Sequence, residues 1–256
     1  MSDSPLKVWL ERDEKLLRLR LNRPKANIVD AAMIAALQEA FEEYAGHTAL
    51  RGVLLDAEGP HFSFGASVKE HLPGSFAAML RALHQLVETM LGFPVPILVA
   101  IRGQCLGGGL EVVCAASQLF AAPDAAMGQP EIQLAVFAPA ASCLLPERIG
   151  QGQAEDLLFS GRSIKADEAL SMGLINSIAD DPEAAALDYF DKHLAPRSAS
   201  SLRFAVQAVR GDLLPRVKAR LADVEALYTE GLMTTHDAVE GLTSFLEKRP
   251  AKWEDR

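Results

Sequence analysis

Three consecutive glycines between a buried-strand pattern and an apolar helical pattern constrain the fold of this chain more than any other feature. Residues 95–101 are short, apolar and β-branched, as in a buried strand, and residues 110–116 can form a buried helix. Gly107, Gly108 and Gly109 stand between them, and without a Cβ their backbone can approach another group closely. The pattern is not G-x-G-x-x-G, so it does not indicate a dinucleotide site. The free N–H groups of the first helical turn instead favour a negative oxygen.

The same order of strand, polar turn and helical start occurs earlier in the chain. Residues 52–56 match another short buried strand, and Gly65 and Ala66 follow it in a polar turn. Ala66 therefore offers a second backbone N–H close to a strand end, and ligands of open α/β folds gather at such ends.

Two carboxylates accompany these turns. Glu111 lies just inside the helix that follows the glycines, and Glu131 ends the segment 128–131, which reads Gly-Gln-Pro-Glu. Taken singly, Glu111 could only complement a helix dipole, and Glu131 could be an ordinary loop side chain. Together with free N–H groups, however, the pair suits acid–base chemistry on a carbonyl compound.

Strand and helix patterns alternate up to about residue 150, and the rest of the chain is mostly helical. A β-hairpin is expected at residues 6–10 and 16–21, and Asp30 is expected to cap a helix at residues 31–44. Further strands are predicted at 52–56, 95–101, 118–121 and 174–178, and further helices at 75–91, 110–116, 154–159, 166–172, 182–194, 198–209, 215–229 and 235–248. This order predicts an α/β core over residues 1–195 and a helical region for oligomer contacts over residues 196–256.

Composition excludes several classes of partner. The net charge of −9 argues against nucleic acids and anionic membranes, and no window reaches the roughly 20 apolar residues of a spanning helix. The first five residues lack the basic and apolar regions of a signal peptide. Cys105, Cys114 and Cys143 lack metal-ligand spacing and have apolar neighbours, so we expect reduced core cysteines, no bound metal and a cytoplasmic protein.

These motifs, in this order, resemble those of the enoyl-CoA hydratase/isomerase family, also called the crotonase family. The resemblance covers nearly the whole chain and includes residues 22–27, 59–70, 103–111, 128–131, 157–162, 169–175 and 245–249. It implies a core of repeated ββα turns with a C-terminal helical region. It also implies a homotrimer, or a hexamer made of two trimers. The implied ligand is an acyl-CoA thioester, with no cofactor besides the coenzyme A of the substrate.

The resemblance assigns roles to individual residues. It implies that Ala66 and Gly108 supply the oxyanion-hole N–H groups and that Glu111 and Glu131 are the catalytic glutamates of a hydratase, a hydro-lyase. The residues that it places along the path of coenzyme A are Lys25, Ala26, Ser67, Val68, Phe245 and Lys248. Two N–H groups can stabilise the charge that develops on the thioester oxygen, and one ionised and one protonated carboxylate can divide the proton transfers. The sequence leaves open which glutamate is the acid and which the base.

Two segments depart from the family pattern. Ser67 stands where many members have aspartate, and residues 136–143 replace a glycine-rich run. The added Cβ atoms should reshape the acyl pocket, and Pro139 has no N–H. Together with residues 25–30 and 103–106, the segment resembles the branch that adds water 1,4 to cyclic dienoyl-CoA thioesters in anaerobic benzoyl-CoA breakdown. Such an addition needs the acid further from the carbonyl than in a simple hydratase.

Three other functions remain open. A general enoyl-CoA hydratase differs only through residues 136–143, and an isomerase would use Glu131 alone. A non-catalytic binding subunit, for RNA for instance, is disfavoured by the net charge and by the presence of both glutamates. The histidines that show no partner in the sequence, and that we expect to be surface or core residues, are His61, His71, His84 and His236.

Overall fold

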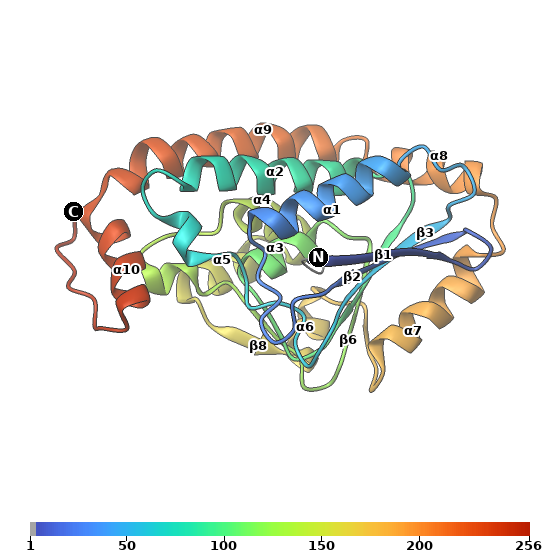
Figure 1. Ribbon diagram of the computed structural model, residues 1–256, viewed down its shortest axis with the longest axis horizontal. Coiled ribbons are helices and arrows are strands. Elements are labelled where there is room, and N and C mark those ends of the chain that lie inside the picture. The colour runs from blue at the N-terminus through green and yellow to red at the C-terminus, as the bar shows by residue number, and fades with distance from the viewer. Residues whose placement is uncertain (1–3) are drawn as a thin grey trace.

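The described residues of the computed structural model, 4–256, form two β-sheets covered by helices (Figure 1). The larger sheet has the order β1-β2-β3-β4-β6-β9, in which β1 and β2 are antiparallel and the other pairs are parallel. The smaller sheet has the order β5-β7-β8. The strands are β1 (Leu6–Glu11), β2 (Leu16–Leu21), β3 (Gly52–Ala57), β4 (Ile97–Ile101), β5 (Gln104–Leu106), β6 (Gln118–Ala121), β7 (Ala126–Gly128), β8 (Ser163–Lys165) and β9 (Ser177–Ile178). The signal-peptide prediction concerns residues 1–5, of which 1–3 lie outside the described residues.

Helices cover the larger sheet (Figure 1). The α-helices are α1 (Ala31–Tyr44), α2 (Phe76–Gly92), α3 (Gly108–Cys114), α4 (Pro139–Ile149), α5 (Gln151–Ser160), α6 (Ala166–Met172), α7 (Pro182–Tyr189), α8 (Ala199–Arg210), α9 (Leu213–Ala226) and α10 (His236–Glu247). Shorter helical turns are η1 (Val68–His71), η2 (Pro130–Leu134), η3 (Phe190–Leu194), η4 (Leu227–Gly231) and η5 (Leu232–Thr234).

From β4 to β7, consecutive strands alternate between the two sheets, and this alternation builds the repeated ββα core that was predicted. β4 of the larger sheet is followed by β5 of the smaller sheet and then by α3, and β6 is followed by β7 and then by η2 and α4. After β3, Ser63 forms an isolated bridge to Cys105 on β5 and extends the same pattern. The segments that follow β3, β5 and β7 are therefore brought side by side.

Local sequence signals explain several of these elements. The Asp30 side chain accepts a hydrogen bond from the Met33 N–H at 2.9 Å, so the predicted cap of α1 is confirmed. The three cysteines are buried and unpaired, as predicted, and burial raises the pKa of each thiol.

Other element boundaries differ from the prediction. β4 begins at Ile97 rather than residue 95, α3 begins at Gly108 rather than 110, and the strand predicted at 174–178 is only Ser177–Ile178. The helices predicted at 182–194 and 215–229 end earlier, and each continues as a wider π-helical turn, η3 or η4. The three short strands β5, β7 and β8 and the helix α4 were not predicted, because runs of three residues carry no periodicity and two prolines interrupt the pattern of α4.

The C-terminal helices are distributed along the molecule. Figure 1 shows α9 lying along α2, with α8 and α10 at opposite ends. Lys218 on α9 pairs with Glu88 on α2 at 2.7 Å, and His84 on α2 pairs with Glu225 on α9 at 2.8 Å. Within residues 4–256, no helix has the length and apolar character needed to cross a membrane. The domain boundary at residue 195 and the oligomer contacts of residues 196–256 stay predictions.

Candidate active site

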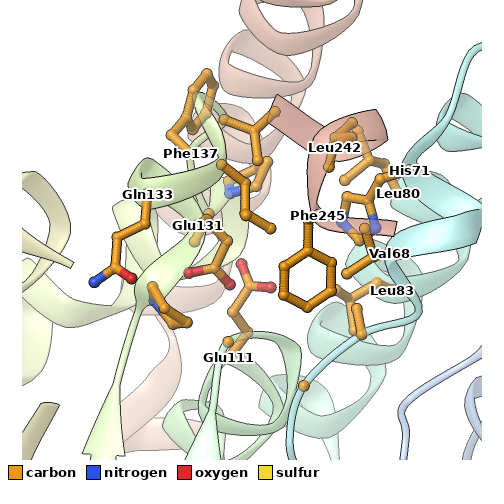
Figure 2. Close-up of a pocket in the computed structure, with 18 of the residues that line it drawn as sticks. Val68, His71, Leu80, Leu83, Glu111, Glu131, Gln133, Phe137, Leu242 and Phe245 are labelled. Carbon is orange, nitrogen blue, oxygen red and sulfur yellow. The ribbon is translucent and has the colours of Figure 1, made fainter. Parts of the chain in front are cut away.

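A cavity of about 290 Å³ lies where the ends of the ββα repeats meet η1, α2 and α10 (Figure 2). Its acidic groups are Glu111 and Glu131, whose carboxylates lie together in Figure 2. Most of the other lining residues are apolar. The lining consists of Phe64, Gly65, Ala66, Val68, His71, Leu80, Leu83, Gly107, Glu111, Pro130, Glu131, Gln133, Leu134, Val136, Phe137, Ala138, Pro139, Leu242 and Phe245.

Glu111 is held by the N-terminus of another helix. It lies in the first turns of α3 and is 4% exposed, and its Oε1 accepts a hydrogen bond from the Ala141 N–H of α4 at 3.0 Å. Burial raises the pKa of Glu111, while the backbone N–H groups of Ala141 and Ala140 oppose that rise. Pro139 begins α4, a position where a missing N–H costs no helical hydrogen bond. The unusual segment 136–143 thus supplies both cavity wall and donors to a glutamate.

Glu131 approaches the glycine turn from η2. Gly107 has a φ of 49°, which favours glycine, and a Cβ placed there would lie 2.7 Å from Glu131 Oε1 and displace the carboxylate. The pKa of Glu131 is raised, mainly by burial and then by the charge of Glu111. The side chain of Gln129 is also buried beside Glu131. When its amide nitrogen is turned toward the carboxylate, that nitrogen lies 3.0 Å from Glu131 Oε2 and 3.1 Å from Glu131 Oε1.

Two backbone N–H groups lie close to the carboxylates and have no hydrogen-bond partner among residues 4–256. Within residues 4–256, neither the Ala66 N–H nor the Gly108 N–H donates a hydrogen bond, whereas the Gly107 N–H donates to the Gly128 carbonyl at 2.9 Å. A Cβ placed on Gly65 would lie 3.5 Å from the Gly108 nitrogen, which shows how closely the two turns pack. The arrangement can therefore receive a carbonyl oxygen next to a pair of carboxylates.

The residues predicted to contact coenzyme A divide into two groups. Val68 and Phe245 line the cavity, and Phe245 is 54% exposed. Lys25, Ala26, Ser67 and Lys248 are not part of the cavity lining. Their contacts with coenzyme A stay predictions.

The four histidines that we expected to be surface or core residues each have a polar partner in the structure. Their ring nitrogens make these contacts: His61 Nδ1 accepts from the Gln104 N–H at 3.1 Å, His71 Nδ1 lies 2.9 Å from the Ser67 carbonyl oxygen, His84 Nδ1 lies 2.8 Å from Glu225, and His236 Nδ1 lies 2.9 Å from Asp237. Of these four, His71 lines the cavity. Sequence reasoning missed this role, because nothing local to η1 shows that α10 and α2 close around it.

A tyrosine behind the cavity wall was also missed. Tyr228 is fully buried and packs edge-on against Phe137, with ring centroids 5.2 Å apart. Its hydroxyl has no hydrogen-bond partner among residues 4–256. Burial and the charges of Glu111 and Glu131 raise the pKa of Tyr228. A buried hydroxyl without a partner therefore lies behind the apolar wall that contains Phe137.

Comparison with known proteins places this geometry in a family. The family model described as enoyl-CoA hydratase/isomerase matches residues 11–256. A protein of Thauera aromatica named cyclohexa-1,5-dienecarbonyl-CoA hydratase is 69% identical over 255 residues, covering 100% of this chain and 99% of that protein. A probable enoyl-CoA hydratase of Bacillus subtilis (strain 168) is 31% identical, over 94% of this chain and 96% of the relative.

Solved structures of this family have the same fold. The crystal structure of an enoyl-CoA hydratase/isomerase from Pseudoalteromonas atlantica T6c is 27% identical, with a TM-score of 0.83 over 97% of this chain and 99% of that chain. The match therefore extends over the whole fold as well as the whole sequence. The chain belongs to the enoyl-CoA hydratase/isomerase family.

Proposed function

We propose that this protein is a hydro-lyase that adds water to cyclohexa-1,5-diene-1-carbonyl-CoA and forms 6-hydroxycyclohex-1-ene-1-carbonyl-CoA. The observation that carries the proposal is the 69% identity, over essentially the full length of both chains, with the Thauera aromatica protein of that name. The retention of two neighbouring glutamates in one cavity, with two free N–H groups in the adjoining turns, supports it. The reaction belongs to anaerobic breakdown of benzoyl-CoA.

The surroundings of the two glutamates favour different protonation states, and therefore different roles. Backbone N–H groups of α4 hydrogen-bond to Glu111 and stabilise its ionised form. Glu131 lies beside that negative charge, which favours its protonated form. Glu111 is accordingly the base that deprotonates the attacking water. Glu131 keeps its proton and donates a hydrogen bond that orients the same water.

The free N–H groups stabilise the intermediate. Hydroxide adds to the carbon β to the thioester, and the displaced electron pair moves through the conjugated system onto the thioester oxygen. The N–H groups of Ala66 and Gly108 donate to that oxygen as its charge develops. The apolar wall formed by Val136, Phe137 and Pro139 packs against the ring of the substrate.

The coenzyme A part of the substrate lies toward the surface, beyond the part of the cavity that holds the acyl group. In the proposal, Val68 and Phe245 contact the pantetheine at the cavity, and Ala26 and Ser67 continue its path. The exposed ammonium groups of Lys25 and Lys248 meet its phosphates. No cofactor other than the coenzyme A of the substrate is required, since the chemistry consists of proton transfers and electrostatic stabilisation.

We further propose that the protein is a cytoplasmic homotrimer or a dimer of trimers. Exposed apolar side chains on α8 support a contact between copies, because Phe204 is 72% and Val209 83% exposed. Light scattering coupled to size-exclusion chromatography measures the molar mass directly. A mass of three or six chains agrees with the proposal, and a monomer contradicts it.

The experiment for the proposed function compares two substrates and two proteins. Wild type and Glu131→Gln are assayed with cyclohexa-1,5-diene-1-carbonyl-CoA and with crotonyl-CoA, a linear enoyl thioester. Rapid hydration of the cyclic diene that depends on Glu131, with slow hydration of crotonyl-CoA, supports the proposal. A preference for crotonyl-CoA makes the protein a general enoyl-CoA hydratase instead.

A further inference from the structure

The cavity wall formed by η1, α2 and α10 contains one titratable side chain among its lining residues. Figure 2 shows this wall, with Val68, His71, Leu80, Leu83 and Phe245 gathered on the side away from the helical turn η2, which carries Glu131. All of these except His71 are hydrocarbon side chains. An imidazole in such a wall is costly unless it has a polar partner, so its role needs a physical explanation.

The structure defines the tautomer of this imidazole. His71 Nδ1 lies 2.9 Å from the Ser67 carbonyl oxygen, and a carbonyl oxygen can only accept, so Nδ1 carries the hydrogen. The other ring nitrogen, Nε2, makes no hydrogen bond within residues 4–256, yet it is not sealed from solvent as His84 Nε2 is. Burial lowers the pKa of His71, which favours the neutral ring. Nε2 is then a proton acceptor without a partner among residues 4–256, on a residue that lines the cavity.

The geometry of the ring requires a second proton-transfer position. This step rests on the proposed function. In a 1,4-addition to the cyclic diene, the carbon that receives hydroxide and the carbon that receives the proton lie at opposite corners of a six-membered ring. When the first corner lies at the water held by Glu111 and Glu131, the opposite corner points away from both carboxylates. The wall containing His71 is on that side.

We propose that His71 is a further catalytic residue, whose Nε2 exchanges the proton at the ring carbon opposite the hydroxyl-bearing carbon. In dehydration, neutral Nε2 takes that proton, and the electron pair of the C–H bond moves into the ring and onto the thioester oxygen. The pair then returns as the C–O bond to the hydroxyl breaks, and the leaving hydroxide takes a proton from protonated Glu111. Hydration is the reverse: protonated His71 donates from Nε2 to the dienolate after Glu111 has deprotonated water.

Two substitutions distinguish this catalytic role from the structural role of holding the Ser67 carbonyl next to Ala66. The asparagine of His71→Asn places an N–H near the position of Nδ1, so it can keep the hydrogen bond to Ser67 while Nε2 is lost. His71→Leu removes both. We expect each variant to lower kcat for the cyclic diene about 100-fold or more, with KM within threefold of wild type, because a positioned acid or base contributes about 10²–10⁴-fold. His193→Asn, on η3 and outside the cavity lining, is the matched control and keeps wild-type kcat.

An isotope readout tests the position of the transferred proton. Incubation of the hydroxylated product in D2O with wild type is expected to introduce deuterium at the carbon opposite the hydroxyl-bearing carbon, and His71→Asn is expected to abolish this exchange. If the His71→Asn enzyme keeps its kcat and the deuterium exchange, His71 is not a catalytic residue. If only His71→Leu loses activity, the role of His71 is limited to holding the Ser67 carbonyl. No turnover of the cyclic diene by wild type overturns both this inference and the proposed function. Turnover by wild type that survives His71→Asn overturns this inference alone.

Discussion

Gly108 lies against Ala66 so closely that a Cβ on Gly108 would be 2.9 Å from the Ala66 Cβ and 3.0 Å from the Ala66 nitrogen. Both contacts involve backbone or a methyl group directly attached to it, so no flexible side chain can move away. The two N–H groups that the proposed mechanism directs at one oxygen are therefore held together by the absence of a side chain. This relationship joins the turn after β3 to the turn after β5.

Gly108→Ala should lower activity without unfolding the protein. The added methyl group pushes the Ala66 turn away, so one N–H no longer reaches the thioester oxygen, and loss of one such donor typically costs about 100-fold or more in kcat. Steady-state kinetics with the cyclic diene measures the effect. Gly46→Ala is the matched control, because a Cβ there meets nothing within 4 Å. Equal kcat values for Gly108→Ala and wild type would show that this contact does not set the oxyanion geometry.

Glu131→Gln should stabilise the protein more at pH 8 than at pH 5. The pKa of Glu131 is raised from its usual 4.5 in the folded protein, so the folded state binds the proton more tightly than the unfolded state. Its contribution to the free energy of unfolding is then complete below pH 4.5 and decreases as the pH rises through neutrality. Glutamine removes this decrease, so the variant gains stability relative to wild type as the pH rises from 5 to 8. Urea denaturation at the two pH values measures it.

Glu240 provides a control in which the Glu→Gln substitution should change stability at pH 8 in the opposite direction. Arg249 lowers the pKa of the Glu240 carboxyl to about 2, so this ion pair stabilises the folded state at pH values above the usual range of the carboxyl. Its contribution is lost as the pH falls toward 2. Glu240→Gln should therefore lower stability at pH 8, whereas Glu131→Gln raises it. The same direction of change in both variants would contradict the assigned pKa shifts.

Tyr228→Phe should increase the stability of the protein by about 1 kcal/mol. A buried hydroxyl without a partner carries a desolvation cost of about 1–3 kcal/mol, and phenylalanine keeps the ring contact with Phe137. The midpoint of urea unfolding reports the change. Tyr189→Phe, at a partly buried tyrosine, should leave the midpoint within about 0.5 kcal/mol of wild type. A destabilised Tyr228→Phe variant would mean that the hydroxyl has a partner in solution.

Phe245→Ala should weaken substrate binding more than catalysis. Phe245 lines the cavity but is half-exposed in the free protein, so a bound thioester would cover much of its ring. Loss of that apolar contact predicts a KM about tenfold higher, with kcat within threefold. Phe159→Ala, at an exposed phenylalanine on α5 outside the cavity lining, is the matched control and should leave KM unchanged. A fall in kcat with unchanged KM would place Phe245 at the reacting atoms instead.

Much of the candidate site could be predicted because its motifs are local. The glycine run, the Ala66 turn and the two glutamates each lie within a few residues of a strand end or helix start, so their backbone geometry follows from short-range rules. The cap of α1 by Asp30 is predictable for the same reason. The segments predicted to meet at the site do so, because the parallel strands end at neighbouring positions.

The parts of the fold and the site that could not be predicted depend on contacts between residues far apart in the sequence. β5 and β7 are three residues long and exist because they pair with each other, through Cys105 and Met127 for instance. Likewise, Glu111 and its donor Ala141 are separated by 30 residues. No local pattern shows that the N-terminus of α4 faces α3.

The sequence by itself determined which chemical groups the site can use: two carboxylates, two unpaired backbone N–H groups and the glycines that make room for them. Only the tertiary structure decided their protonation and the identity of the wall opposite them. Burial and neighbouring charge set the pKa values of Glu111 and Glu131, and both arise from segments far apart in the chain. His71 joins the site for the same reason, because its position in the cavity depends on how η1 packs against α2 and α10.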